Sequence, residues 1–443
     1  MKPDKIIKLA IILLIAGTIA GTLGVAGAER PYLQAAAKAA RWIESTTVTT
    51  LQGAVWPAVP PDAGTIQANL YSGVSGTVLF LLEMNRATGE KKYLDEAVRA
   101  ADYLLADLAE EKDMGLYTGV SGIAYVLEET YKLSGQKKHR DGLLLGLNKI
   151  RAGVVKAGKG VEWTNVTDII SGSSGLGLFL LYAARELNEP ALVVLAGQAA
   201  DRLIELGRPE GGGLKWAMSP DFARLMPNFS HGTAGVAYFL ATLYQQTTKK
   251  EYLDAALAGA KYLLSVADTA DDGCLIFHNE PDSRNLFYLG WCHGPAGTAR
   301  LFERLFEVTG DPGWKSWMLK SGRSILRSGI PEKQTPGFWN NVGLCCGSAG
   351  VADFFLGLCR KTGDKTYLDF ALRLTADLLT KAAPEQGGLK WIQAEHRVRP
   401  DFLQAQTGLM QGAAGVGLWL LRLDAHFQGR KSVIVLPDDP FGN

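Results

Sequence analysis

The sequence predicts an all-α fold, a closed α/α toroid of seven helical hairpins. Two observations predict it. A glycine-marked helix start recurs seven times along the chain, and a second helical pattern fills the intervals between the copies. Strand-like alternation is confined to short runs such as GGLKW at Gly212 and at Gly387. Self-similarity at this spacing indicates that each copy is one supersecondary unit.

The seven helix starts share a Gly-x-small-Gly pattern followed by an apolar run, as in YSGVSGTVLFLL at Tyr71. Their first glycines are Gly73, Gly119, Gly172, Gly232, Gly294, Gly347 and Gly412. The apolar faces of these helices are nearly continuous, so we expect them to form the inner ring. We expect glycine at each start because the helix starts crowd around one axis and because glycine tolerates a positive φ.

The intervals hold helices in which Tyr, Leu and Ala recur at helical spacing, which indicates one buried face and an outer position. Copies begin at Gly89, Lys249 and Gly363, and a degraded copy begins at Gly310. A linear array would expose its two ends, whereas a closed ring buries them. We therefore predict a single domain over residues 29–443, although about 150 residues per domain would suggest three. The tail from Lys431 to Asn443 is expected to be a surface extension.

The 46 Lys+Arg balance 45 Asp+Glu, for a net charge of +1. A nucleic-acid partner is not expected, because it would select a basic surface. We expect a monomer.

The N-terminus differs from the rest. Basic residues (Lys2, Lys5 and Lys8) precede an uncharged apolar run over residues 9–28. This pattern predicts that residues 1–28 are a signal peptide cleaved after Ala28. The alternative is a retained membrane anchor through residues 6–28, since about 20 apolar residues can span a bilayer. The basic start places the remainder outside the cytoplasm. The protein is therefore expected to be exported, periplasmic or extracellular, or anchored facing outward.

If the copies are equivalent, the two residues before each first glycine occupy equivalent places at the mouth of the toroid. We call these fourteen positions the slot residues. They are Tyr71-Ser72, Tyr117-Thr118, Ile170-Ser171, Ser230-His231, Cys292-His293, Cys345-Cys346 and Met410-Gln411. Three of the five cysteines and two of the six histidines fall in these slots, all in the fourth, fifth and sixth copies.

The clustered cysteines predict a metal site. Thiolate and imidazole are the usual zinc ligands, and three protein ligands leave an open fourth position, as in catalytic sites. Cys292, Cys345 and Cys346 would bind one Zn²⁺. Two alternatives stay open, a disulfide formed by Cys292 in an exported protein and inert packing of small buried residues.

The remaining cysteines and histidines are expected to have structural roles or to border the cleft. Cys274 and Cys359 are predicted to be structural. His139 and His426 are predicted to lie on the surface, and His278 and His396 in loops that border the cleft. These last six assignments rest on local sequence alone.

Together, the seven helix starts, WCHG at Trp291 and GLCCG at Gly343 resemble the lanthionine synthetase C-like (LanC-like) family, in a variant with a Cys-Cys-Gly zinc motif. The resemblance covers about Gln34 to Gln428. It implies an α/α toroid with a central zinc. It also implies the addition of a thiol to dehydroalanine or dehydrobutyrine in a peptide, which closes a lanthionine or methyllanthionine thioether ring. In one branch of the family, glutathione is the thiol.

The resemblance also assigns residues. Cys292 and Cys345 match the first two zinc ligands, and Cys346 stands where a His is usual. His231 and Asp168 match the active-site His and Asp. Two positions depart from some cyclases, which carry Arg four residues before the first ligand and Tyr just after it; here these are Tyr288 and His293.

The implied chemistry gives roles to these side chains. Coordination to zinc deprotonates a substrate thiol of pKa about 8.5. We expect His231 to protonate the enolate formed by thiolate addition, with His293 as the second candidate. Asp168 would orient the imidazole; the alternative is a helix cap. For His231 the alternative is a hydrogen-bonded core histidine.

Three other functional classes are alternatives to this hypothesis. A non-catalytic peptide-binding scaffold would keep the toroid, with or without zinc. A carbohydrate-active toroid enzyme would need paired carboxylates at the mouth, and the slot residues contain none. Protein prenyltransferase subunits also combine a toroid with zinc, but no signal for a partner subunit is evident.

The predicted substrate is a peptide with Cys and dehydrated Ser or Thr, or a dehydropeptide with a small thiol. Because such cyclases generally act in the cytoplasm, export implies action on exported peptides, a different reaction of a thiol with an electrophile, or loss of the cyclase activity.

Overall fold

A computed structural model describes residues 29–432 and 434–442. The chain divides into two units at Pro31, and the second unit, Tyr32–Asn443, carries the fold described below. The predicted signal peptide or anchor, residues 1–28, lies outside the described residues. Among the helices that are described, none combines the length and apolar character needed to cross a bilayer.

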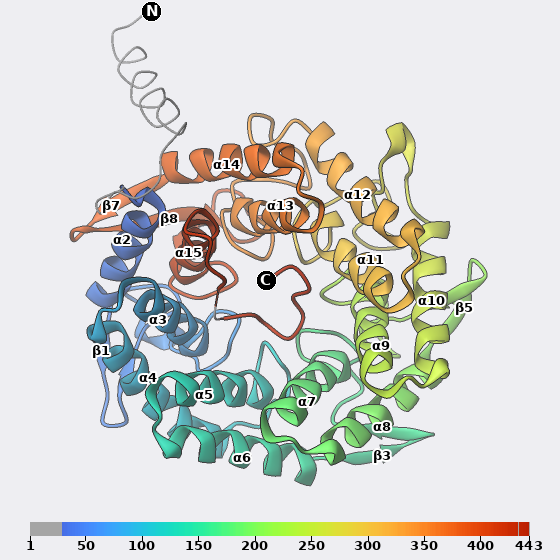
Figure 1. The fold of residues 1–443 in the computed structure, drawn as a ribbon, viewed down its shortest axis with the longest axis horizontal. Helices are drawn as coiled ribbons and strands as arrows, with labels where there is room; N and C mark the ends of the chain where they lie inside the picture. The colour runs from blue at the N-terminus through green and yellow to red at the C-terminus, as the bar shows by residue number, and fades with distance from the viewer. Residues whose placement is uncertain (1–28, 433, 443) are drawn as a thin grey trace, which may run out of the picture. The chain divides into compact units, whose positions relative to one another are not determined.

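An inner ring of seven helices, each 15 residues long, surrounds the centre of this unit (Figure 1). The inner helices are α3 (Val74–Thr88), α5 (Val120–Ser134), α7 (Ser173–Leu187), α9 (Thr233–Thr247), α11 (Pro295–Thr309), α13 (Ser348–Thr362) and α15 (Ala413–Phe427). Each begins directly after one of the predicted first glycines. Their side chains are buried almost all round, as the continuous apolar runs predict.

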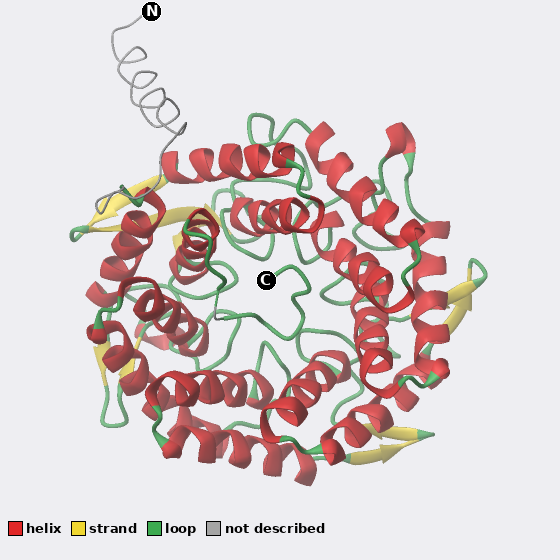
Figure 2. Ribbon diagram, viewed as in Figure 1, coloured by secondary structure: helices red, strands yellow, loops and turns green. Residues whose placement is uncertain are grey.

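An outer ring of seven helices covers the inner one (Figure 2). The outer helices are α2 (Pro31–Ser45), α4 (Lys91–Glu110), α6 (Lys137–Ala152), α8 (Pro190–Leu206), α10 (Lys250–Ser265), α12 (Pro312–Arg327) and α14 (Lys365–Thr380). Each buries one face, for example Tyr93, Ala97 and Leu104 in α4. The predicted all-α toroid is confirmed.

The two ends of the unit close the ring. Within it, α2 supplies an outer helix and α15 an inner one, and the rings of Tyr32 and Phe427 stack with centroids 5.9 Å apart. The indole of Trp42 in α2 also donates a hydrogen bond to Glu385, beyond α14. The seventh helix pair is therefore built from segments far apart in the sequence.

The strands of the described residues are short antiparallel hairpins in loops between helices. They are β1 (Val48–Thr49) with β2 (Ala54–Val55), β3 (Val155–Ala157) with β4 (Gly160–Glu162), β5 (Arg208–Glu210) with β6 (Gly213–Lys215), and β7 (Ala382–Glu385), β8 (Gly388–Ala394) and β9 (Leu403–Ala405) in one sheet. The two GGLKW runs lie in and around β6 and β8, as their alternation predicts. Two 3₁₀ helices, Ala63–Thr65 and Ala270–Asp272, complete the elements.

The steric reason for glycine at the helix starts holds, but the expected positive φ does not. All seven first glycines have negative φ, from −97° at Gly73 to −153° at Gly119. A Cβ at Gly232 would lie 1.5 Å from the carbonyl oxygen of Met226. Close approach of backbone to backbone therefore excludes a side chain there.

The prediction for the C-terminal tail is wrong. Residues 434–442 do not extend over the surface but enter the space enclosed by the inner ring (Figure 1). Ile434, Asp438 and Phe441 are at most 3% exposed. Two buried arginines of inner helices, Arg300 and Arg422, hold the tail, and neither arginine was identified from the sequence.

Candidate metal centre

A closed circuit of backbone hydrogen bonds joins the seven helix starts. Each link runs from an N–H to the carbonyl of the corresponding residue in a neighbouring copy, over 2.8–3.2 Å. The links run from Tyr71 to Tyr117, from Tyr117 to Ile170, from Ile169 to Ser230, from Ser230 to Cys292, from Cys292 to Cys345, from Cys345 to Met410 and from Met410 back to Tyr71. The slot residues are therefore equivalent, as predicted, with a one-residue offset in the third copy.

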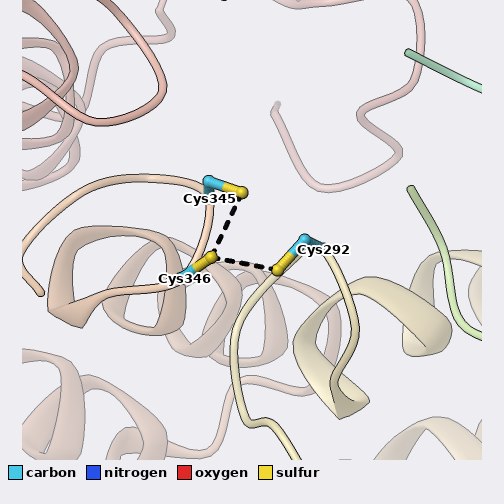
Figure 3. A group of neighbouring side chains, drawn as sticks. All are labelled: Cys292, Cys345 and Cys346. Carbon is cyan, nitrogen blue, oxygen red and sulfur yellow. Dashed lines mark hydrogen bonds between the residues drawn. The ribbon is translucent and has the colours of Figure 1, made fainter. Parts of the chain in front are cut away.

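This circuit places the fifth and sixth copies side by side and brings their cysteines together (Figure 3). The sulfur of Cys292 lies 3.1 Å from that of Cys346, which lies 3.4 Å from that of Cys345. All three sulfurs lie within 4.8 Å of one another, and all three residues are buried. Two neighbouring hairpins thus supply one cluster.

The donor set fits zinc. Three sulfurs around a tetrahedral zinc with bonds of about 2.3 Å would lie about 3.8 Å apart. The two shortest separations, 3.1 and 3.4 Å, are somewhat smaller, so the sulfurs would move apart by a few tenths of an ångström on binding the ion. The three cysteines are free thiols, as are Cys274 and Cys359, so no disulfide joins the cysteines of the described chain. The cluster could hold a metal ion.

Without a metal, the cluster favours one negative charge. Hydrogen bonds from Cys292 and Cys346 lower the pKa of Cys345 well below its usual range, despite burial, and Tyr71 adds a further hydrogen bond. Burial and its sulfur neighbours raise the pKa of Cys292. For Cys346, a hydrogen bond with Cys292 lowers the pKa, but Cys345 and burial outweigh it and the pKa is raised. Neighbouring sulfurs thus disfavour a second and a third negative charge in the cluster. A divalent cation would offset these negative charges.

His231 and Asp168 form a pair beside the cluster. His231 Nδ1 lies 2.5 Å from Asp168 Oδ2, and Asp168 is fully buried. Asp168 Oδ1 accepts the N–H groups of Ser171 and Gly172, at 2.8 and 2.9 Å. One oxygen of Asp168 therefore holds the turn that precedes α7 and the other holds the imidazole, whereas the helix itself begins after Gly172 without a side-chain cap.

The pair favours a protonated imidazole at His231. Burial disfavours the charged form, but the hydrogen bond and the charge of Asp168 outweigh it, with a contribution from Cys345, so the pKa of His231 is raised. Burial lowers the pKa of His293 well below its usual range, helped by His278 and His231. Among the described residues, His293 Nδ1 has no hydrogen-bond partner. His231 is thus the better proton donor of the two.

His278 borders the site as predicted. Its ring lies 4.5 Å from that of His293 and 4.3 Å from that of Tyr288, centroid to centroid. Burial and the charges of Arg397, Arg224 and His231 lower the pKa of His278 to about 4. Burial raises the pKa of Tyr288 to about 12, although Arg397 lowers it. The rings of His278, Tyr288 and His293 thus pack together next to Cys292.

Sequence reasoning gave no role to three other groups at the site, although two of them are slot residues. Gln411 donates to the Tyr71 hydroxyl at 3.1 Å and lies 4.0 Å from the sulfur of Cys346. Trp291, next to Cys292, packs against Tyr117. A cavity of about 260 Å³ opens over this set and is lined by Tyr71, Thr118, Ser230, His231, Cys292 and Cys345, among others. The slot positions were the signal that could have found Tyr71 and Gln411.

The other histidines and cysteines do not belong to the group formed by Cys292, Cys345 and Cys346. His396 is exposed. His426 is half-buried, whereas His139 is fully buried, so its predicted surface position is wrong. The imidazole of His139 on α6 faces α4, where its Nε2 lies 3.2 Å from Asp102. Cys274 and Cys359 are buried, in keeping with structural roles.

A two-ring α toroid with a cysteine cluster at its inner helix starts defines the class of fold and site. The family model described as lanthionine synthetase C-like protein matches residues 65–430. The chain belongs to the lanthionine synthetase C-like family.

Solved structures share the fold. Nisin cyclase superposes with a TM-score of 0.61 at 17% identity, covering 90% of this chain and 95% of that one. The Lin0763 protein from Listeria innocua gives a TM-score of 0.53 at 14% identity, with coverages of 90% and 97%. An α-1,6-mannanase of Salegentibacter sp. HEL1_6 gives 0.49 at 14% identity, with coverages of 88% and 99%. At these identities the likeness concerns the fold alone.

Proposed function

We propose that this protein is a zinc-dependent enzyme that adds a thiol to a dehydroalanine or dehydrobutyrine residue of a peptide. One observation carries the proposal. Three sulfurs from neighbouring hairpins meet within 4.8 Å, at a cavity that His231, paired with Asp168, also lines. Membership of the lanthionine synthetase C-like family supports the same reaction class.

The proposed ligands of one Zn²⁺ are Cys292, Cys345 and Cys346, a Cys-Cys-Gly variant of the family's zinc motif. When bound with an open fourth position, the ion supplies a Lewis acid at which a substrate thiol, mostly protonated near pH 7, loses its proton. Three anionic sulfurs make the site electron-rich, which favours a nucleophilic thiolate. Gln411 and Tyr71 hold these sulfurs in place by hydrogen bonds.

The proton that completes the reaction comes from His231. The thiolate sulfur bonds to the β-carbon of the dehydro residue, the double-bond electrons move onto the carbonyl as an enolate, and the α-carbon then takes a proton. Asp168 keeps the His231 imidazole protonated and oriented for that transfer. His293, whose pKa burial lowers, is the second candidate for this proton transfer.

The cavity favours a peptide segment over a carbohydrate. Its volume of about 260 Å³ accommodates a side chain with the adjoining backbone, and the residues that line it include hydroxyls and sulfurs but no carboxylate. Glycoside hydrolysis needs two carboxyl groups flanking one bond. The substrate is therefore a peptide carrying Cys and a dehydrated Ser or Thr, or a dehydropeptide with a small thiol.

We also propose that the enzyme works as a monomer outside the cytoplasm, either released after cleavage at Ala28 or anchored through residues 6–28. The basic and apolar N-terminal sequence supports this location. N-terminal sequencing of the protein recovered from its host would give Glu29 first if the signal is cleaved. Recovery of the intact N-terminus from the cytoplasm would contradict the proposal.

The direct test is an addition assay. The purified protein is incubated with a dehydroalanine-containing peptide, in one arm with a Cys in the same peptide and in the other with glutathione. The reaction is then stopped by alkylating the free thiols, and thioether products are measured by mass spectrometry. We expect zinc-dependent product in at least one arm. Stoichiometric zinc and bound peptide without product in either arm would favour the scaffold alternative.

A further inference from the structure

The C-terminal segment, residues 434–442, fills the space inside the inner ring. Ile434 N–H donates to Glu83 of α3, Tyr125 of α5 donates to the Val435 carbonyl, and Arg360 of α13 donates to the Gly442 carbonyl. The ring of Phe441 packs on that of Phe354, with centroids 5.6 Å apart. The segment enters beside α3, turns at Pro437–Asp438, and returns along α13.

Charged groups anchor the turn. Asp439 accepts from Arg300 of α11 at 2.9 Å and from Arg422 of α15 at 3.0 Å. Arg422 also donates to Asp353 of α13 at 2.8 Å. These side chains are 10% exposed or less. Two arginines and two aspartates thus form a buried network. Removing one of them would leave an uncompensated buried charge.

The tip of the turn reaches a group of aromatic residues that adjoins the cysteine cluster. Both carboxylate oxygens of Asp438 lie within hydrogen-bond reach of the Tyr117 hydroxyl, at 3.1 and 3.2 Å. The Tyr117 ring packs on Trp291 at 5.4 Å and on Tyr71 at 6.5 Å between centroids. Trp291 immediately precedes Cys292, and the Tyr71 hydroxyl hydrogen-bonds Cys345.

We propose that the C-terminal segment is part of the functional site, in which Asp438 is a positioning residue that fixes Tyr117 and, through it, Trp291 and Tyr71 beside the three sulfurs. Tyr117 is 1% exposed, so its hydroxyl has no solvent to replace Asp438 as an acceptor.

The inference predicts that replacing Asp438 makes the cysteine sulfurs more accessible, although Asp438 acts on them only through Tyr117. In metal-free protein, iodoacetamide labelling of Cys345, followed by peptide mass spectrometry, reports their accessibility. We expect Asp438→Ala to label about fivefold faster or more, since thiol reaction rates follow access and environment. Asp438→Asn keeps an acceptor oxygen and should stay within about twofold of the wild type. Tyr117→Phe should raise the rate, and the double variant D438A/Y117F should add little to either single change.

A matched control separates positioning from general loss of stability. Leu147→Ala removes a fully buried side chain of the outer helix α6, far from the segment in sequence. It should lower the thermal midpoint without accelerating the labelling of Cys345. If Asp438→Ala labels no faster than the wild type, or no faster than Leu147→Ala at an equal loss of midpoint, the inference is overturned. If Asp438→Ala does not fold, Tyr117→Phe against Leu147→Ala decides the same question.

A second readout uses Co²⁺ in place of zinc, and this arm alone rests on the proposed function. The sulfur-to-cobalt absorption of Asp438→Ala should shift in position or intensity, whereas that of Leu147→Ala should match the wild type. Unchanged spectra would count against the inference. A wild type that binds neither Co²⁺ nor Zn²⁺ would remove the proposed function, and the labelling rates would still decide the role of Asp438.

Discussion

The imidazole of His231 and the carboxylate of Asp168 lie 2.5 Å apart, although they come from different hairpins of the inner ring. Asp168 cannot turn away, because its other oxygen accepts two backbone N–H groups ahead of α7. The pair therefore has one fixed geometry at the edge of the cysteine cavity.

The first prediction concerns this pair. His231→Ala should retain zinc but lose thiol addition to a dehydropeptide by about 10²–10⁴-fold, the range over which general acid catalysis contributes. Asp168→Asn should lower the rate less, because the imidazole remains. Product formation by mass spectrometry and zinc content of the same samples provide the measurement. His426→Ala, at the far end of α15, is the control and should leave both unchanged; loss of zinc in His231→Ala would place this residue among the ligands instead.

The second prediction is the pH dependence. Asp168 raises the pKa of His231 above its ordinary value. A proton donor must be protonated, so kcat/KM should be maintained below that raised pKa and fall as the pH rises through it. In Asp168→Asn the raising charge is lost, and the falling limb should move to lower pH. If kcat/KM of this variant falls over the same pH range as that of the wild type, another group, such as the substrate thiol, determines the pH dependence.

The third prediction concerns the metal. The wild type should contain about one zinc per chain, and Cys345→Ala should abolish it, since two thiolates leave a three-ligand site incomplete. Cys346→His should retain zinc, because imidazole is also a zinc ligand, but should slow thiol addition as one anionic sulfur is lost. Cys359→Ala, a buried thiol outside the cluster, is the control. Metal analysis after dialysis provides the measurement, and full zinc in Cys345→Ala would remove the proposed ligand set.

The ring and its cysteine cluster could be predicted because the sequence repeats. Equivalent positions before each first glycine must lie in one circle if the copies are equivalent, and the hydrogen-bond circuit through Cys292 and Cys345 shows that they do. His231 lies at the site for the same reason. These inferences needed only the spacing of glycines and the residue types beside them.

The parts that could not be predicted depend on contacts outside the repeat. The tail has no counterpart in any copy, and its proline-rich end suggested a surface extension, whereas Arg300 and Arg422 bind it inside the ring. The partners of those arginines lie in the tail, outside the repeating copies, so they could not be inferred from periodicity. His139 was misplaced similarly, because Asp102 lies 37 residues away on another outer helix.

The last prediction tests why glycine stands at the helix starts. At Gly297, the second glycine of the fifth copy, a Cβ would lie 1.8 Å from the carbonyl oxygen of Trp291, the residue before Cys292. Gly297→Ala must therefore displace backbone next to a proposed ligand. This substitution should lower the free energy of unfolding by more than about 4 kcal/mol, a loss that single substitutions cause only when they disrupt packing or the backbone. The variant should also lose its zinc.

The matched change is Gly310→Ala at the end of the same helix. Gly310 has a φ of +69°, and nothing lies within 4 Å of an added Cβ. Only the cost of a left-handed conformation applies, about 1–2 kcal/mol, so this variant should melt slightly earlier and keep its zinc. Thermal midpoints and zinc content of the two variants give the comparison. Equal losses would mean that backbone conformation, and not the approach of chain to chain, selects glycine in this helix.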